Sequence, residues 1–116
     1  MAERELQLVE TLQFRHKHVV SLLQVLFDSP EKQRVVMIYD LVDGVELFDL
    51  INSLPGCCLP EGRARRYFRH LRSAVDYIHQ RGLAHRDIKP ENCMIETATD
   101  HLKVRAGGRG CADAVR

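Results

Sequence analysis

The first half of the chain contains one amphipathic segment followed by two apolar runs. Over residues 2–13, apolar side chains recur at helical spacing on one side and charged or amide side chains lie elsewhere, which predicts an amphipathic helix. The runs VVSLLQVLF (19–27) and RVVMIYDLV (34–42) are rich in Val and Ile, and the polar segment between them contains Pro30, which suits a turn. We therefore expect the two runs to pair as an antiparallel hairpin.

Two helices are predicted in the middle of the chain. The segment VELFDLINSL (45–54) fits a short helix that ends before the helix breaker Pro55. A longer helix is expected over residues 61–80, with Pro60 at its start and Gly82 at its end. The apolar residues of this helix recur at helical spacing and predict a face that packs on a core: Ala64, Tyr67, Phe68, Leu71, Val75 and Ile78.

The pattern changes again after residue 104. Residues 93–95 (CMI) and 101–104 (HLKV) are expected to pair as a second, small hairpin. Residues 105–116 contain Gly and Arg in place of any periodicity, so no packed structure is expected there. The sequence therefore predicts one folded unit over residues 1–104 and an aberrant, disordered tail over residues 105–116.

The composition is typical of a small, soluble, globular domain. Hydrophobic residues make up 45% and charged residues 28% of the 116 residues. The formal net charge of +1 gives no electrostatic reason to expect nucleic acid or an anionic membrane as a partner. The apolar runs are too short to span a bilayer and the start MAERELQ does not resemble a targeting peptide, so a cytoplasmic location is expected.

The four cysteines are Cys57, Cys58, Cys93 and Cys111, and none of them forms a Cys-x-x-Cys pair. We interpret all four as reduced thiols. A zinc site that combines them with some of the six histidines is conceivable, but the ligand spacing of such sites is missing, so this alternative is not favoured.

The segment HRDIKPEN (85–92) brings an acid, a base and an amide together directly after the long helix. Phosphoryl transfer requires a carboxylate that orients a hydroxyl group, a cation near the moving phosphoryl group and an oxygen ligand for magnesium. Asp87, Lys89 and Asn92 can each supply one of these. The alternative is a charged, solvated turn that contains these residues by chance, which the number of specified positions disfavours.

This segment resembles the catalytic loop of eukaryotic protein kinases, and the Lys two residues after the Asp resembles the serine/threonine-specific branch. LPEGRARRYFRHLRSAVDYIHQRGLAHRD is similar to the helix that leads into this loop, and MIYDLVDGVELFDLI resembles strand five, the hinge and the following helix. RELQLVETLQFRHKHVVSLL is similar to the end of helix C and strand four. The resemblance is strongest to the calmodulin-dependent and AMP-activated kinase group. It implies an α+β, mainly helical, partial protein-kinase-like fold with helix C, strands 4–5, the hinge, helices D and E, the catalytic loop and strands 7–8.

The resemblance also implies a role for each residue of the catalytic loop. Asp87 matches the catalytic base, Lys89 the contact to the γ-phosphate and Asn92 a magnesium ligand. His85 and Arg86 match the residues that brace the loop. ATP and Mg²⁺ are the cofactors that the resemblance implies.

A second set of residues matches the nucleotide-binding positions of the family. The backbones of Asp40 and Val42 match the positions that hydrogen-bond adenine, Glu46 matches a ribose contact and Met94 matches the floor beneath adenine. Tyr39 aligns with the residue at the back of the pocket that this family calls the gatekeeper, although an ordinary core aromatic at the end of a strand is the simpler interpretation.

The sequence departs from the family pattern in ways that affect the chemistry. Glu5 matches the helix C glutamate that would bind the strand-three lysine and so support the phosphates, but taken alone it fits a solvated charge on a helix. The 116 residues begin at helix C, so they include neither that lysine nor a glycine-rich loop. Ala106 falls where the family has its metal-binding Asp, and a methyl group cannot coordinate a hard cation, which prefers oxygen.

These features together predict a fragment of a protein serine/threonine kinase that transfers phosphoryl groups from ATP to protein hydroxyls by ancestry and is inactive as an isolated chain. One alternative is a pseudokinase-like protein-interaction module without catalysis, and another is a translation product that does not fold. The expected partner is a protein substrate or a regulatory protein. The sequence leaves the oligomeric state open.

Overall fold

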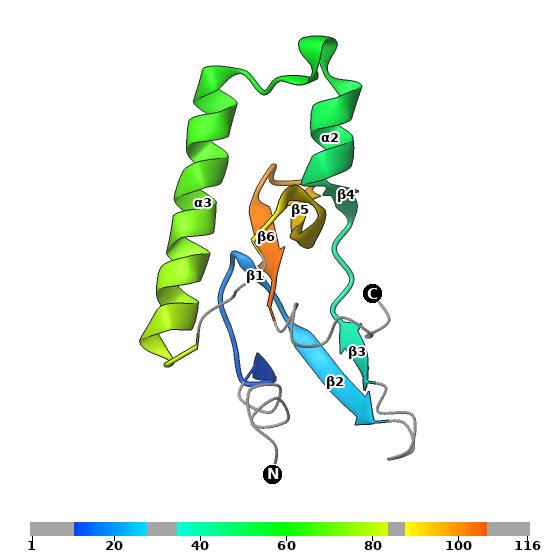
Figure 1. The fold of residues 1–116 in the computed structure, drawn as a ribbon, viewed down its shortest axis with the longest axis vertical. Helices are drawn as coiled ribbons and strands as arrows, with labels where there is room; N and C mark the ends of the chain where they lie inside the picture. Colours follow the sequence, from blue (N-terminus) through cyan, green and yellow to red (C-terminus); the bar gives the residue numbers. More distant parts are fainter. Residues whose placement is uncertain (1–10, 28–34, 84–87, 107–116) are drawn as a thin grey trace.

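The computed structural model describes residues 11–27, 35–83 and 88–106. The predicted helix over residues 2–13 lies almost wholly outside these ranges. In chain order the described elements are β1 (Val19–Val20), β2 (Leu22–Phe27), β3 (Val35–Tyr39), β4 (Gly44–Glu46), α2 (Leu47–Ser53), the 3-10 helix η1 (Pro55–Cys57), α3 (Glu61–Gln80), the 3-10 helix η2 (Pro90–Asn92), β5 (Cys93–Glu96) and β6 (Leu102–Arg105) (Figure 1).

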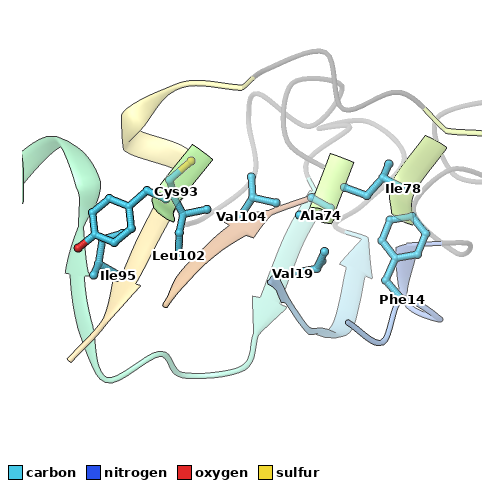
Figure 2. Packing of buried hydrophobic residues seen from close by; sticks show 10 residues of the cluster. Phe14, Val19, Ala74, Ile78, Cys93, Ile95, Leu102 and Val104 are labelled. Carbon is cyan, nitrogen blue, oxygen red and sulfur yellow. The ribbon is translucent and has the colours of Figure 1, made fainter. Parts of the chain in front are cut away.

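The larger sheet has the strand order β1-β6-β5-β4. β1 runs parallel to β6, whereas the β6–β5 and β5–β4 pairs are antiparallel. Buried and partly exposed side chains alternate along β5 and β6, as expected for strands with one face on a core. This face packs against the long helix α3 (Figure 2), and the buried cluster between them contains Phe14, Val19, Tyr67, Ala74, Ile78, Cys93, Ile95, Leu102, Val104 and Ala106.

The second hairpin predicted from the sequence is confirmed by this sheet. Ile95 pairs with Leu102, and Cys93 pairs with Val104. The turn between the two strands includes Asp100, which has a positive φ of 57°. Its carboxylate is held by the Tyr67 hydroxyl at 2.5 Å and by the Arg63 guanidinium at 2.9 Å, so α3 fixes the turn as well as the strands.

The first predicted hairpin is correct for only part of its length. β2 and β3 form a separate two-stranded antiparallel sheet, in which Leu26 pairs with Val36. The prediction of one strand over residues 19–27 is wrong, because the chain leaves this sheet at Ser21 and β1 pairs with β6 instead. Val19 and Val20 are both buried there, so the removal of their apolar side chains from water stabilises the pairing of β1 with β6.

The short helix predicted over residues 45–54 begins two residues later than expected. Gly44–Glu46 form the strand β4, and the helix α2 covers Leu47–Ser53. A Cβ at Gly44 would overlap the carbonyl oxygen of Ile95, so the close approach of β4 to β5 requires glycine at this position. Pairing with β5 therefore outweighs the helical pattern at Val45 and Glu46.

The long helix α3 spans Glu61–Gln80, as predicted, and Gly82 follows it with a φ of +80°. Its buried residues are Tyr67, Ala74 and Ile78. The prediction that Phe68 belongs to the core face is wrong, since 65% of this residue is exposed. Neighbouring helical positions differ by about 100° around the axis, so Tyr67 and Phe68 cannot both point at the sheet.

Packed structure extends slightly beyond the predicted boundary at residue 104. Arg105 is the last residue of β6, and Ala106 is buried against the core. Residues 107–116 lie outside the described ranges. Among the helices of the described ranges, none has both the length and the apolarity needed to cross a lipid bilayer.

Candidate functional site

A cavity of about 280 Å³ lies where the two sheets meet. Residues from β1, β3, β5, β6 and the connector after β3 line it: Val20, Met37, Tyr39, Asp40, Leu41, Val42, Met94 and Arg105. Most of these side chains are apolar, and Arg105 adds one cation. Such a cavity suits a largely apolar ligand that also carries polar atoms.

The connector Asp40–Val42 forms one wall of the cavity. The backbone N–H of Asp40 donates to the carbonyl oxygen of Ser21 at 2.8 Å, which joins the connector to the β1–β2 junction. The sequence-predicted residues Asp40 and Val42 both border the cavity.

Met94 forms part of the cavity lining from β5. Because buried and partly exposed residues alternate along this strand, Met94 points away from the face that packs on α3. In the sheet register, Met94 is paired with Glu46 on β4 and with Lys103 on β6. The structure thus brings the predicted ribose contact Glu46 beside Met94, on the face that borders the cavity.

Arg105 is a cavity residue that the sequence interpretation assigned to the tail. Its guanidinium donates to the carbonyl oxygen of Glu91, and its Nη2 lies 4.0 Å from Oε1 of Glu46. The Arg105 side chain is 16% exposed and that of Glu46 is 39% exposed. The sequence contains a signal for this position. Side chains alternate between the two faces of a strand, so extending the predicted strand by one residue places Arg105 on the same face as Lys103.

Tyr39 ends β3 at the cavity and also ties the two sheets together. Its hydroxyl donates to the carbonyl oxygen of Ala106 at 2.5 Å, and its Oη lies 3.7 Å from the sulfur of Met37. The bond to Ala106 joins the end of β3 to the residue that follows β6. Tyr39 is therefore a structural aromatic in this chain as well as part of the cavity lining.

The described part of the predicted catalytic loop is a turn of 3-10 helix. Pro90 begins η2, and the backbone N–H of Asn92 donates to the carbonyl oxygen of Lys89 at 2.9 Å. Lys89 is partly exposed, whereas Asn92 is only 2% exposed. The structure therefore places Lys89 and Asn92 in one turn. The other predicted residues of the loop, His85, Arg86 and Asp87, lie outside the described residues, as does Glu5.

The described residues do not fit a magnesium site. Mg²⁺ requires oxygen ligands in nearly octahedral geometry. Ala106 has no side-chain oxygen and its methyl group is buried, while its carbonyl oxygen already accepts the Tyr39 hydroxyl. Within residues 11–27, 35–83 and 88–106, no group of three or more His, Cys, Asp or Glu side chains is placed to hold a metal ion.

Cys93, at the start of β5, is a core residue and not a nucleophile. Burial raises the pKa of its thiol to about 11, against a smaller opposing effect of the Arg105 charge. The thiol is therefore protonated at neutral pH, and thiols react as thiolates. Cys57, Cys58 and Cys93 are all free thiols in the described ranges.

Comparisons with known proteins identify the family. The family model described as "Protein kinase domain" matches residues 1–108. CBL-interacting protein kinase 29 of Oryza sativa subsp. japonica is 44% identical over 108 residues, which cover 93% of this chain and 23% of that protein. CBL-interacting serine/threonine-protein kinase 16 of Arabidopsis thaliana is 43% identical over 102 residues, covering 88% of this chain and 20% of that protein.

A solved structure supports the same fold. The kinase domain of PknI from Mycobacterium tuberculosis superimposes with a TM-score of 0.74 at 22% sequence identity, over 90% of this chain and 40% of that chain. This likeness confirms the partial protein-kinase-like α+β fold predicted from the sequence. The chain spans about a fifth of the length of the curated relatives named above. The 116 residues therefore belong to the protein kinase domain family and form part of such a domain, related to serine/threonine kinases of the calmodulin-dependent and AMP-activated group.

Proposed function

We propose that this chain is part of a protein serine/threonine kinase and that its cavity binds the adenosine portion of ATP. The observation that supports this most directly is the convergence of Asp40, Val42 and Met94 on one largely apolar cavity of about 280 Å³. In this proposal the backbones of Asp40 and Val42 orient the adenine, Met94 lies beneath the ring and Glu46 contacts the ribose. Sites of this kind combine an apolar slot with a few fixed polar atoms.

Phosphoryl transfer is proposed to depend on the loop after α3. The hydroxyl oxygen of a protein substrate attacks the γ-phosphorus of ATP, ADP leaves with the electrons of the broken P–O bond, and Asp87 receives the hydroxyl proton. Lys89 would stabilise the negative charge on the γ-phosphate. Asn92 matches the magnesium ligand of the family, but the described residues do not fit a magnesium site, because Ala106 has no side-chain oxygen. We therefore expect the 116-residue chain to be inactive by itself.

Inactivity of the isolated chain can be measured directly. We expect the purified chain to show no magnesium-dependent transfer of labelled phosphate from ATP to generic protein substrates above the level of an Asp87→Ala variant. The physical reason is that phosphoryl transfer depends on positioning and electrostatic stabilisation, and Ala106 supplies no charge at the metal position. Transfer that is clear in the parent and lost in Asp87→Ala would contradict this expectation.

Binding of the nucleoside is a separate question, and Arg105 provides a sensitive test. Because the Arg105 guanidinium already lies 4.0 Å from Glu46, the ribose must compete with it for that carboxylate. We expect Arg105→Ser to tighten the binding of adenosine about two- to tenfold, the range that corresponds to one hydrogen bond. Isothermal titration calorimetry with adenosine, which has no phosphate to attract the cation, measures this effect.

Lys103→Ser is the matched control for this experiment. Lys103 lies two residues earlier on β6 and its ammonium pairs with Glu96 at 3.3 Å, so it is a neighbouring cation that is not part of the cavity lining. Its removal should leave the affinity for adenosine within a factor of about two, as expected for a partly exposed ion pair. Equal effects of the two substitutions would refute the role given to Arg105, and the absence of any adenosine binding would refute the adenine site.

A pseudokinase-like interaction module is the second candidate. Ala106 at the metal position favours it, as do the exposed apolar side chains of Leu41, which lines the cavity, and of Val45 and Phe48. The relatives are named for interaction with CBL proteins, so a regulatory protein of that kind is the proposed partner, and a protein substrate is the partner expected for a kinase. Circular dichroism during heating separates a module that folds, with one cooperative transition, from a chain that does not.

A further inference from the structure

Four histidine rings from three separate segments meet beside the β1–β6 pair. His16 and His18 precede β1, His70 belongs to α3 and His101 lies directly before β6. The rings of His18 and His70 stack with centroids 4.1 Å apart and planes 13° apart. His101 contacts both, with centroids 5.0 Å from His70 and 5.4 Å from His18, and His16 lies 5.7 Å from His18. We call these four residues the histidine cluster.

The peptide groups of Leu102 fix the protonation of the two stacked rings. The backbone N–H of Leu102 donates to Nδ1 of His70 at 3.1 Å, so this nitrogen carries no proton. The carbonyl oxygen of Leu102 accepts from Nδ1 of His18 at 2.9 Å, so that nitrogen does carry one. The first residue of β6 is thus held between α3 and the segment before β1. Protonation of His70 at Nδ1 would bring a second N–H donor opposite the Leu102 N–H, so this hydrogen bond would be lost.

The charged groups around the cluster disfavour a second positive charge. The positive charge of Lys17 acts on His16, His18 and His70, that of Arg66 acts on His70, and that of Arg81 acts on His16. Burial, followed by the charges of His18 and His101, lowers the pKa of His70 to about 4. Burial also lowers the pKa values of His16 and His18.

Within the described residues, two carboxylates of the β5–β6 hairpin already have cationic partners. Asp100 is bound by Arg63, Arg66 and the Tyr67 hydroxyl, all from α3. The Glu96 carboxylate pairs with Lys103 and accepts the Thr99 hydroxyl. Neither carboxylate is paired with His70.

We propose that the histidine cluster is a pH-sensitive junction between α3, the start of β6 and the segment before β1. The junction is closed when the stacked rings of His18 and His70 are neutral. Acid opens it, because the protonated rings repel each other and His70 loses its hydrogen bond to Leu102. Opening releases the segment before β1 and the start of β6 from α3. β1 and β6 supply Val20 and Arg105 to the cavity, so opening also loosens one wall of it. The junction does not depend on nucleotide binding.

The direction of the pH effect follows from the binding of protons to the two states. His70 has a lower pKa in the folded chain, about 4, than the ordinary value of 6.5, so the unfolded chain binds its proton first. The stabilisation is fully present above about pH 6.5 and is lost progressively as the pH falls toward about 4. Acidification through this window therefore weakens the junction.

The titration of His70 in the parent chain is the primary test. Two-dimensional NMR of the imidazole C–H groups should give a pKa for His70 clearly below the ordinary value of 6.5 and close to about 4. A value for His70 near about 6.5, the ordinary value, would overturn the proposal, whether the junction is differently arranged or not formed.

Thermal melting of matched variants tests the pH-sensitive junction independently. Between about pH 7.5 and about pH 5, the melting temperature of the parent should fall, and in His70→Asn it should fall by less than half as much, because the Asn side-chain oxygen replaces Nδ1 as acceptor for the Leu102 N–H but takes up no proton. His79 is exposed in the last turn of the same helix, and His79→Asn should keep the full pH dependence of the parent. Equal falls in the parent and His70→Asn would overturn the proposal.

Discussion

Replacing Ile78 by alanine is expected to lower the free energy of unfolding by about 2–5 kcal/mol, the range measured for large-to-small substitutions in protein cores. Ile78 is 1% exposed and packs in the cluster between α3 and the sheet, with Phe14 and Val19 among the cluster's other members (Figure 2). The lost methyl and methylene groups leave a cavity that the surrounding strands cannot fill completely. Urea denaturation followed by circular dichroism measures the loss.

Phe68→Ala on the same helix is the control for this prediction. It removes a larger side chain, but one that is 65% exposed, so the expected change is within about 0.5 kcal/mol. If both substitutions destabilised the chain equally, the assignment of the core face to Tyr67, Ala74 and Ile78 would be wrong.

Gly44→Ala is expected to destabilise the chain by at least about 2 kcal/mol, as overpacking of backbone against backbone commonly does. The added methyl carbon would overlap the carbonyl oxygen of Ile95 and lie 2.8 Å from its carbonyl carbon. Because a strand backbone cannot rotate away as a flexible side chain can, β4 must separate from β5. We expect a lower urea midpoint and a loss of adenosine affinity, because Glu46 lies two residues after Gly44 in the same short strand.

Gly62→Ala provides a glycine control in the first turn of α3. No atom lies within 4 Å of a Cβ built there. Alanine loses less conformational entropy than glycine on entering a helix, so this substitution should stabilise the chain by about 0.5 kcal/mol. A destabilisation similar to that of Gly44→Ala would show that the close approach of β4 to β5 is not the cause.

Local sequence features were sufficient to predict α3 and the β5–β6 hairpin. Pro60 and Gly82 mark the two ends of α3, and its helical periodicity is long enough to be unambiguous. The two short strands β1 and β4 could not be predicted in this way. Each has its partner far along the chain, so tertiary pairing with β6 or β5 decides the conformation and local propensity does not.

The candidate site was predictable to a different extent for each residue. Asp40, Val42, Glu46 and Met94 were proposed from the family resemblance, because nothing in their spacing indicates that β5 lies opposite the segment after β3. Arg105 was overlooked because the glycines that follow it suggested an unstructured tail. The proposed roles of Asp87 and Glu5 stay predictions, since both residues lie outside the described ranges.

The parallel pairing of Val19 with Val104 has a consequence for how the chain folds. Almost all other described elements lie between these two strands in the sequence, so joining them requires closure of a very long loop, which slows folding. During synthesis on the ribosome, β1 is made before β6, the strand with which it pairs in the described part of the chain. A nascent or truncated chain that ends before residue 102 would leave the edge of β1 open, and open strand edges invite pairing with other chains.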